Sequence, residues 1–317
     1  MPPITSPAVT APPREETAQR ADSEAAAAST DRGERWQLAL AKLFGRIAEV
    51  SALPDTASRV LNLAQRDDTR VVELYQAIQT DPALAMRVLR RVNSSYYGLR
   101  NKVADLNRAI GLLGFREIRN LVLTVYVARM FREPGDYRGY SRHGLWTHAL
   151  GVAAVARLVS QVSLRGVPDE AYVAGLLHDV GFILLDQHLR RQFCRVLDGI
   201  DEETPTIEVE RKVYTFDHAQ LGGFVARNWS LPDQIADAIG YHHEPQGYGG
   251  EHKELVYLVA IANYLCTRAG WPSLGVQNIS LPPDEVYAGL GLDQGDLRAI
   301  WEDVPAALQR AMSLIEG

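Results

Sequence analysis

The 317 residues are 46% hydrophobic and 23% charged, an ordinary globular composition that is enough for one large domain or two. The net charge of −6 argues against a protein held to DNA, RNA or anionic lipid mainly by its overall charge. No run of about 18 apolar residues occurs and the N-terminus has no apolar signal core, so we expect a cytoplasmic protein without a membrane span.

Residues 1–33 are rich in Pro, Ala, Thr, Ser and Glu and contain no aromatic residue. Such a segment cannot bury enough apolar surface to offset the entropy of ordering, so we expect a disordered tail. Helical apolar spacing begins near Trp36, and it predicts an N-terminal helical lobe over residues 34–135. Within this lobe, Asp81-Pro82 is typical of an N-cap followed by the first turn of a helix.

The basic residues are concentrated in this lobe. Residues 81–132 contain ten Lys and Arg residues against Asp81, Asp105 and Glu117, a local excess of +7. Two predicted helices here meet at Gly114, an arrangement that also occurs in DNA-reading helix-turn-helix motifs. The second helix is mostly apolar, with Arg116 and Arg119 near one end only, so we expect it to pack inside the lobe.

A second helical lobe is predicted over residues 136–270, and a helical extension over 271–317. A junction at Pro134-Gly135-Asp136 separates the lobes. Few alternating β-branched runs and no βαβ rhythm occur, which indicates an all-α protein. The only cysteines, Cys194 and Cys266, lie far apart within apolar helical patterns, and we expect both to be core thiols in a reducing compartment.

An almost wholly apolar stretch, residues 171–185, carries His178 and Asp179 side by side. A buried charge is costly unless it is paired, hydrogen-bonded or bound to a metal, and imidazole with carboxylate suits Fe, Mn, Zn or Ni. Taken alone, each histidine of such a chain is more often a hydrogen-bonded structural residue than a ligand. Five of the eight histidines have helical, apolar surroundings, and this number favours a metal site more than any one of them does alone: His148, His178, His218, His242 and His243.

Several motifs together make the chain similar to HDOD domains, relatives of the HD-domain phosphohydrolases and the HD-GYP cyclic dinucleotide phosphodiesterases. In the second lobe they are Trp146–His148, Gly175–Gly181, Asp217–Gly222, Trp229–Pro232 and His242–Pro245. In the first lobe they are Leu53-Pro54, Asp81–Leu84, Asn93–Gly98 and Ala109–Gly114. The resemblance covers about Leu43 to Ala269 and implies an all-helical HDOD domain with a bacterial signalling or regulatory role.

The resemblance also implies a candidate metal site, because six residues match ligand positions of the related enzymes: His148, His178, Asp179, His218, His242 and His243. Three departures argue against catalysis. Asn263 stands where the enzymes have a last aspartate ligand, Phe182 stands where HD-GYP enzymes have a lysine, and the Gly-Tyr-Pro signature is absent. A neutral amide is a weaker ligand for a dication than a carboxylate.

Three interpretations follow. In the preferred one, the chain is a non-catalytic regulator whose histidine cluster is a structural network able to hold a divalent metal. Since no receiver, kinase or cyclase domain accompanies the motifs, we expect its partners to be signalling proteins encoded elsewhere, with a nucleotide as a second candidate ligand. The alternatives are a metal-dependent phosphohydrolase or cyclic dinucleotide phosphodiesterase, and nucleic-acid or nucleotide binding by the basic lobe.

Overall fold

The computed structural model describes residues 38–66, 68–94 and 97–316. The tail predicted over residues 1–33 lies outside them. The chain divides into two compact units, residues 1–46 and 47–317, and the second unit carries every site discussed below. Within the described ranges, the one extended pairing is an isolated bridge between Tyr137 and Tyr140, so the all-α prediction is confirmed.

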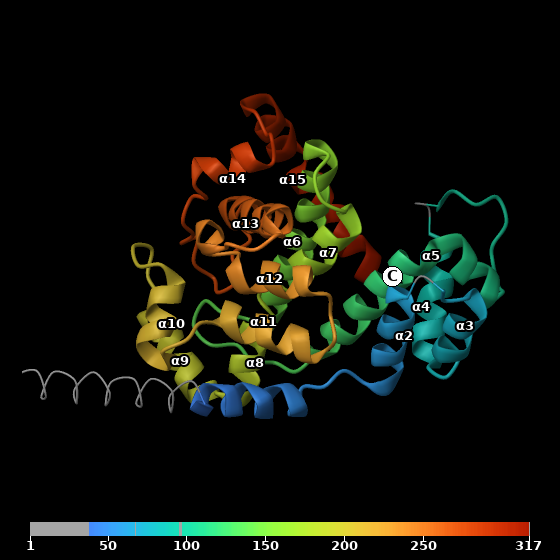
Figure 1. The fold of residues 1–317 in the computed structure, drawn as a ribbon, viewed down its shortest axis with the longest axis horizontal. Coiled ribbons are helices and arrows are strands. Elements are labelled where there is room, and N and C mark those ends of the chain that lie inside the picture. Colours follow the sequence, from blue (N-terminus) through green and yellow to red (C-terminus); the bar gives the residue numbers. More distant parts are fainter. Residues whose placement is uncertain (1–37, 67, 95–96, 317) are drawn as a thin grey trace, which may run out of the picture. The chain divides into compact units, whose positions relative to one another are not determined.

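Four helices form the N-terminal lobe, with a further helix over residues 38–50 preceding them in the chain. They are α2 (Asp55–Gln65), α3 (Val71–Ile78), α4 (Pro82–Val92) and α5 (Leu106–Met130) (Figure 1). As predicted, Asp81 caps α4, because its carboxylate accepts the backbone N–H of Leu84 at 3.0 Å. The opposite carboxylate oxygen of Asp81 accepts the Tyr126 hydroxyl of α5 at 2.7 Å, which fixes the start of α4 against α5.

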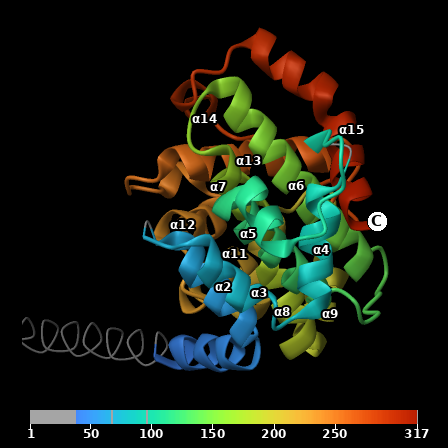
Figure 2. The same ribbon diagram turned by 90° about the vertical axis from the view of Figure 1, so that its right-hand side faces the viewer.

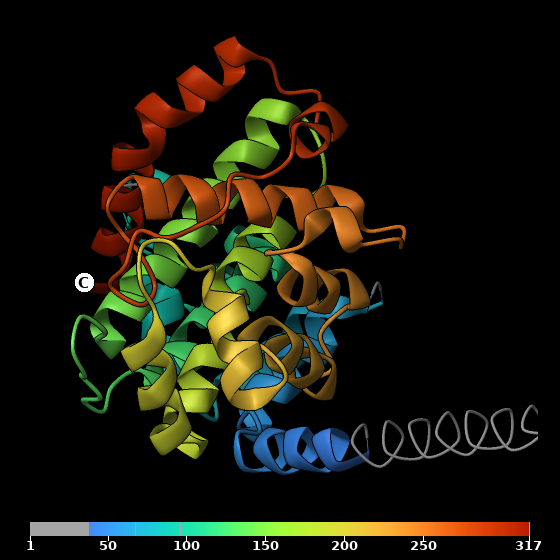
Figure 3. The same cartoon turned by 90° about the vertical axis from the view of Figure 1, so that its left-hand side faces the viewer.

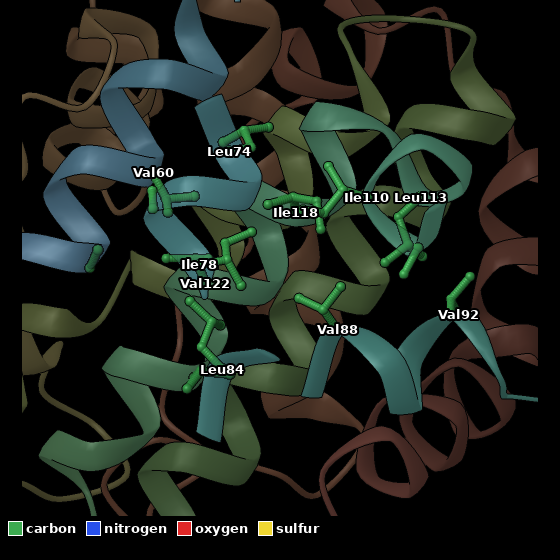
Figure 4. Packing of buried hydrophobic residues seen from close by; sticks show 14 of the residues in the cluster. Val60, Leu74, Ile78, Leu84, Val88, Val92, Ile110, Leu113, Ile118 and Val122 are labelled. Carbon is green, nitrogen blue, oxygen red and sulfur yellow. The ribbon is translucent and has the colours of Figure 1, made fainter. Parts of the chain in front are cut away.

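The core of the N-terminal lobe is aliphatic. Side chains from all four helices point into it, and Figure 4 shows ten of them labelled: Val60, Leu74, Ile78, Leu84, Val88, Val92, Ile110, Leu113, Ile118 and Val122. Most of these side chains are wholly buried, and each contributes about 1.5–3 kcal/mol through removal of apolar surface from water. This core fixes the packing of α4 against α5.

Helix α5 bends at Gly114, where φ is 77° and ψ is 163°, a left-handed backbone that favours glycine. The segment after the bend buries Ile118 and Val122 in the core of the lobe. Even Arg119 is only 8% exposed. The expectation that this helix packs inside the lobe is confirmed, and a base-reading role for its buried face is excluded.

The second lobe is built around the pair α6 and α7, which pack on one another, with α13 packed on both. Its elements are α6 (Arg142–Ser163), α7 (Pro168–Leu177), α8 (Val180–His188), α9 (Arg190–Gly199), α10 (Thr206–Tyr214), α11 (His218–Asn228), α12 (Asp233–Tyr241), the 3-10 turn η2 (Pro245–Gly247) and α13 (Lys253–Arg268). Figure 3 shows this lobe from the side of α9 to α13. Helix α14 (Asp284–Gly289) and helix α15 (Gln294–Glu316) complete the chain, with α15 packed on α6.

The two lobes meet where α5 packs on α7 (Figure 2). Helix α10 carries none of the motifs found in the sequence, which resume at Asp217. Cys266 is buried as predicted, whereas the prediction for Cys194 is wrong, because this thiol is partly exposed. No helix of the described residues is long and apolar enough to cross a membrane.

Candidate metal centre

The six predicted ligands converge in the second lobe because four of the helices that carry them begin or end at one point. His178 and Asp179 form the turn between α7 and α8, and His218 is the first residue of α11. His242 is the C-cap of α12 and His243 follows it, while His148 lies inside α6. Helix ends leave backbone groups without intrahelical partners, so polar side chains are common there.

His178 and His242 each close the end of their own helix in the same way. The Nδ1 of His178 lies 2.7 Å from the carbonyl oxygen of Gly175, and the Nδ1 of His242 lies 2.8 Å from that of Ile239. The Nδ1 of His148 lies 2.6 Å from the carbonyl oxygen of Trp271. A carbonyl only accepts, so Nδ1 carries the hydrogen in all three rings. In a neutral ring this leaves Nε2 with its lone pair.

These Nε2 atoms face one another around Asp179. The Nε2 atoms of His148 and His178 are 3.2 Å apart, and those of His218 and His242 are 3.4 Å apart. Ring nitrogens of the same four histidines lie 3.1–3.6 Å from the Asp179 oxygens. None of these approaches has the alignment of a hydrogen bond, so neither Asp179 oxygen has a hydrogen-bond partner among the described residues.

Glu210 of α10 supports His218 from behind. Its Oε2 lies 2.6 Å from the Nδ1 of His218, and its Oε1 accepts the backbone N–H of the same residue at 3.1 Å. A carboxylate on the distal nitrogen of a histidine is the usual way to orient a metal-binding ring. The sequence analysis missed Glu210, although an acidic residue on the apolar side of a helical pattern, between Ile207 and Tyr214, could have signalled it.

Burial and charge act in opposite directions on these groups. Burial lowers the pKa of His148 and of His242 to about 4, so both rings are neutral at pH 7. Burial also disfavours a charged His218, but the carboxylates of Glu210 and Asp179 outweigh it and raise the pKa of His218 to about 10. Burial alone would raise the pKa of Asp179, but the surrounding histidines hold it well below its ordinary value.

Most of the cluster is closed to solvent. His148, His178 and His218 are 0% exposed and Asp179 is 3% exposed, while His243 is partly exposed. Phe182 stacks on the His218 ring with centroids 3.7 Å apart. Gly181 allows α8 to approach α11, because a Cβ at this position would lie 2.0 Å from the carbonyl oxygen of His218.

The donor set fits a transition-metal cation. Two groups of ligand atoms, each within 4.8 Å of one another, share Asp179: His148 and His178 on one side, and His218, His242 and His243 on the other. Five imidazoles with one carboxylate suit Zn, Fe or Ni better than the all-oxygen shells that Mg²⁺ and Ca²⁺ prefer. Asn263 of α13 is buried, and its amide oxygen accepts the hydroxyl of Thr267 at 3.4 Å. Because position 263 carries an amide, Asp179 is the sole carboxylate of the predicted ligand set.

Comparison with known proteins agrees with this architecture. A structure of an HDOD domain protein of unknown function from Geobacter sulfurreducens is 25% identical and has a TM-score of 0.69, covering 83% of this chain and 93% of that one. A "Putative signal transduction protein" from Marinobacter aquaeolei is 26% identical with a TM-score of 0.68, covering 83% of this chain and 58% of that one. An uncharacterized protein of Treponema pallidum (strain Nichols) is 24% identical over 225 residues, 70% of this chain and 43% of that protein.

The chain spans less than half the length of the curated relatives that it matches. The HDOD domain model matches residues 50–245, a range that includes all six residues of the cluster. This match covers more than half of the chain and both lobes. The chain belongs to the HDOD domain family.

Proposed function

We propose that this chain is a non-catalytic regulatory HDOD protein, and that its histidine cluster is a closed cation site joining the ends of α7, α8, α11 and α12. The observation that carries the proposal is the buried carboxylate of Asp179, whose two oxygens have no hydrogen-bond partner in the described part of the chain and are ringed by imidazole nitrogens. Leaving a buried charged group unsatisfied costs more than about 1–3 kcal/mol.

A divalent cation would remove this cost. Together with Asp179, either His148 and His178 or His218, His242 and His243 would hold it, and in the second case His218 would give up the proton that it otherwise carries. Glu210 would not contact the cation itself but would orient the His218 ring through its contact with Nδ1. In an open site such a cation activates water and neutralises charge on a phosphoryl group.

The closure of the site supports a structural rather than a catalytic role. Catalytic metal sites keep a coordination position open to water or substrate, whereas structural sites are closed. Here Asp179 is 3% exposed and Phe182 stacks on the His218 ring, so the carboxylate is shielded from solvent in this conformation. The apolar Phe182 also offers no donor to a phosphate.

The junction of the lobes supports a regulatory role. It is polar: Glu117 of α5 lies 4.0 Å from Arg157 of α6, and Thr124 of α5 lies 3.5 Å from the hydroxyl of Tyr172 of α7. Polar interfaces between domains permit relative motion more readily than large apolar ones. A ligand or a signalling protein that binds one packing of the lobes better than another would shift their equilibrium.

Hydrolysis assays test the non-catalytic role. Purified protein is incubated with bis(p-nitrophenyl) phosphate and with cyclic dinucleotides, separately with Mn²⁺, Fe²⁺, Zn²⁺, Ni²⁺ and Mg²⁺. We expect no turnover above that of the Asp179→Asn variant. Turnover of the wild type that this substitution abolishes would overturn the proposal in favour of a metal-dependent phosphohydrolase.

A further inference from the structure

A cavity of about 610 Å³ lies at the junction of the lobes, away from the histidine cluster. Its wall comes from α4 and the turn after it, from α5, and from α6 and α7 of the second lobe, with one residue of α15. Ligand sites are typically concave, have volumes of about 300–1,000 Å³ and lie preferentially at domain junctions. The cavity therefore has the size and position of a small-molecule site.

The charge of this cavity is strongly positive. Five cationic side chains line it against a single acidic one, Glu117: Arg87, Arg90, Arg91, Lys102 and Arg157. The three arginines of α4 follow a spacing that places them on one face of the helix. Favourable interaction with the helix dipole accounts for cations in the last turn of α4, where Arg90 and Arg91 lie. It does not account for Lys102 or for Arg157 of α6.

Part of this positive wall is held rigidly. Arg91 pairs with Glu117 at 2.5 Å, and Arg157 pairs with Asp169 at 2.8 Å and stacks over the ring of Tyr172 at 4.5 Å. The Nε of Arg157 is buried and has no acceptor among the described residues. A guanidinium fixed in place loses little entropy when it binds an anion, and its planar fork matches phosphate oxygens.

Two further cations, Arg87 and Lys102, are available to a ligand. Arg87 and Lys102 form no ion pair with any residue in the described ranges. Glu117 and Asp169 neutralise the two fixed arginines, which leaves the charges of Arg87 and Lys102 unbalanced. An anion of two or more charges would balance them.

We propose that this cavity binds a small phosphorylated ligand of the size of a nucleoside phosphate, with its phosphates against α4 and Arg157. Because the cations lie around a concave wall built by several helices, and the whole chain has a charge of −6, the site suits a small molecule rather than a duplex. A ligand held there contacts both lobes at once. It would stabilise one packing of the lobes. This consequence rests on the proposed regulatory role, but the binding of the ligand does not depend on that role.

Isothermal titration calorimetry of the metal-depleted full chain with tripolyphosphate and with ATP tests the proposal. The pocket variant is Arg87→Gln/Lys102→Gln. The matched control is Arg59→Gln/Arg108→Gln, which removes the same charge from exposed positions of the same lobe outside the cavity. We expect wild type and control to bind one equivalent, and the pocket variant to bind at least tenfold more weakly. Circular dichroism checks that all three are folded.

Three results with the wild type, the control and the pocket variant would overturn the proposal, and the Asp179→Asn variant can give a fourth. They are no binding of either probe, equal weakening in the control and the pocket variant, and binding of a 20-base-pair duplex in the absence of binding to tripolyphosphate. The Asp179→Asn variant separates this site from the metal centre: loss of metal with retained tripolyphosphate binding would leave the cavity intact as a distinct site. Loss of tripolyphosphate binding in that variant, with the fold intact, would mean that the phosphates bind at the histidine cluster.

Discussion

Substitution of Glu210 by Gln should perturb the candidate metal centre without replacing a predicted ligand. The carboxylate makes two contacts with His218, one to the ring Nδ1 at 2.6 Å and one to the backbone N–H at 3.1 Å. An amide has one acceptor and one donor end. Either orientation of Gln at position 210 therefore leaves a donor facing a donor.

The ring can relieve this conflict only by moving its hydrogen from Nδ1 to Nε2, which removes the lone pair that a cation needs. Loss of such a supporting contact costs 10–100-fold in metal affinity, or about 1.4–2.7 kcal/mol. Competition of the protein with a chromophoric chelator for Zn²⁺ measures this change. The control is Glu208→Gln, on the exposed side of the same helix, which should leave the affinity unchanged.

Equal Zn²⁺ affinity of the wild type and the folded Glu210→Gln variant would refute the reasoning, because His218 would then not contribute its Nε2. A loss of affinity shared by the Glu208→Gln control would refute it as well, since the effect would follow from net charge rather than from ring orientation.

Three further predictions concern stability, measured by urea unfolding. Gly181→Ala should destabilise by about 1–3 kcal/mol, because the new Cβ would clash with the carbonyl oxygen of His218. Gly111→Ala, with open space at its Cβ, should stabilise by about 0.5–1 kcal/mol, and equal effects would contradict the close approach of α8 and α11. Asp186→Ala should cost about 3–5 kcal/mol, because it leaves two arginines without their buried carboxylate, and a loss below about 1 kcal/mol would contradict this. Asp81→Ala should cost about 1 kcal/mol at pH 7 through loss of the cap of α4. Burial would raise the pKa of Asp81, but its hydrogen bonds outweigh burial and lower the pKa. The difference in unfolding free energy between variant and wild type should therefore shrink as the pH falls through that lowered pKa, and growth of the difference would contradict this.

Much of the fold could be predicted because local chemistry agrees with the tertiary structure. Asp81-Pro82 begins a helix as expected, and Gly114 interrupts one because its φ of 77° suits glycine. The apolar run around His178 and Asp179 predicted burial, and both residues are buried. The convergence of histidines spread from position 148 to position 243 depends on where helices end in space, and the family resemblance rather than spacing suggested it.

The sequence could not reveal interactions between elements that lack a motif. Helix α10 has no strong cap, and its one functional residue, Glu210, is defined only by the ring that it faces. The cationic cavity could not be predicted for the same reason. The excess of basic residues was visible in the sequence, but the contribution of Arg157, from the second lobe, depends on the packing of α5 on α7.

Metal content of the untagged protein, purified without chelator and measured by elemental mass spectrometry, tests the central claim most directly. We predict near-stoichiometric Zn, Fe, Mn or Ni in the wild type, and its loss in folded His178→Ala and Asp179→Ala variants. A well-folded wild type that contains no metal, and takes up none of the four on dialysis, would contradict the claim. The histidines would then be held together by hydrogen bonds alone.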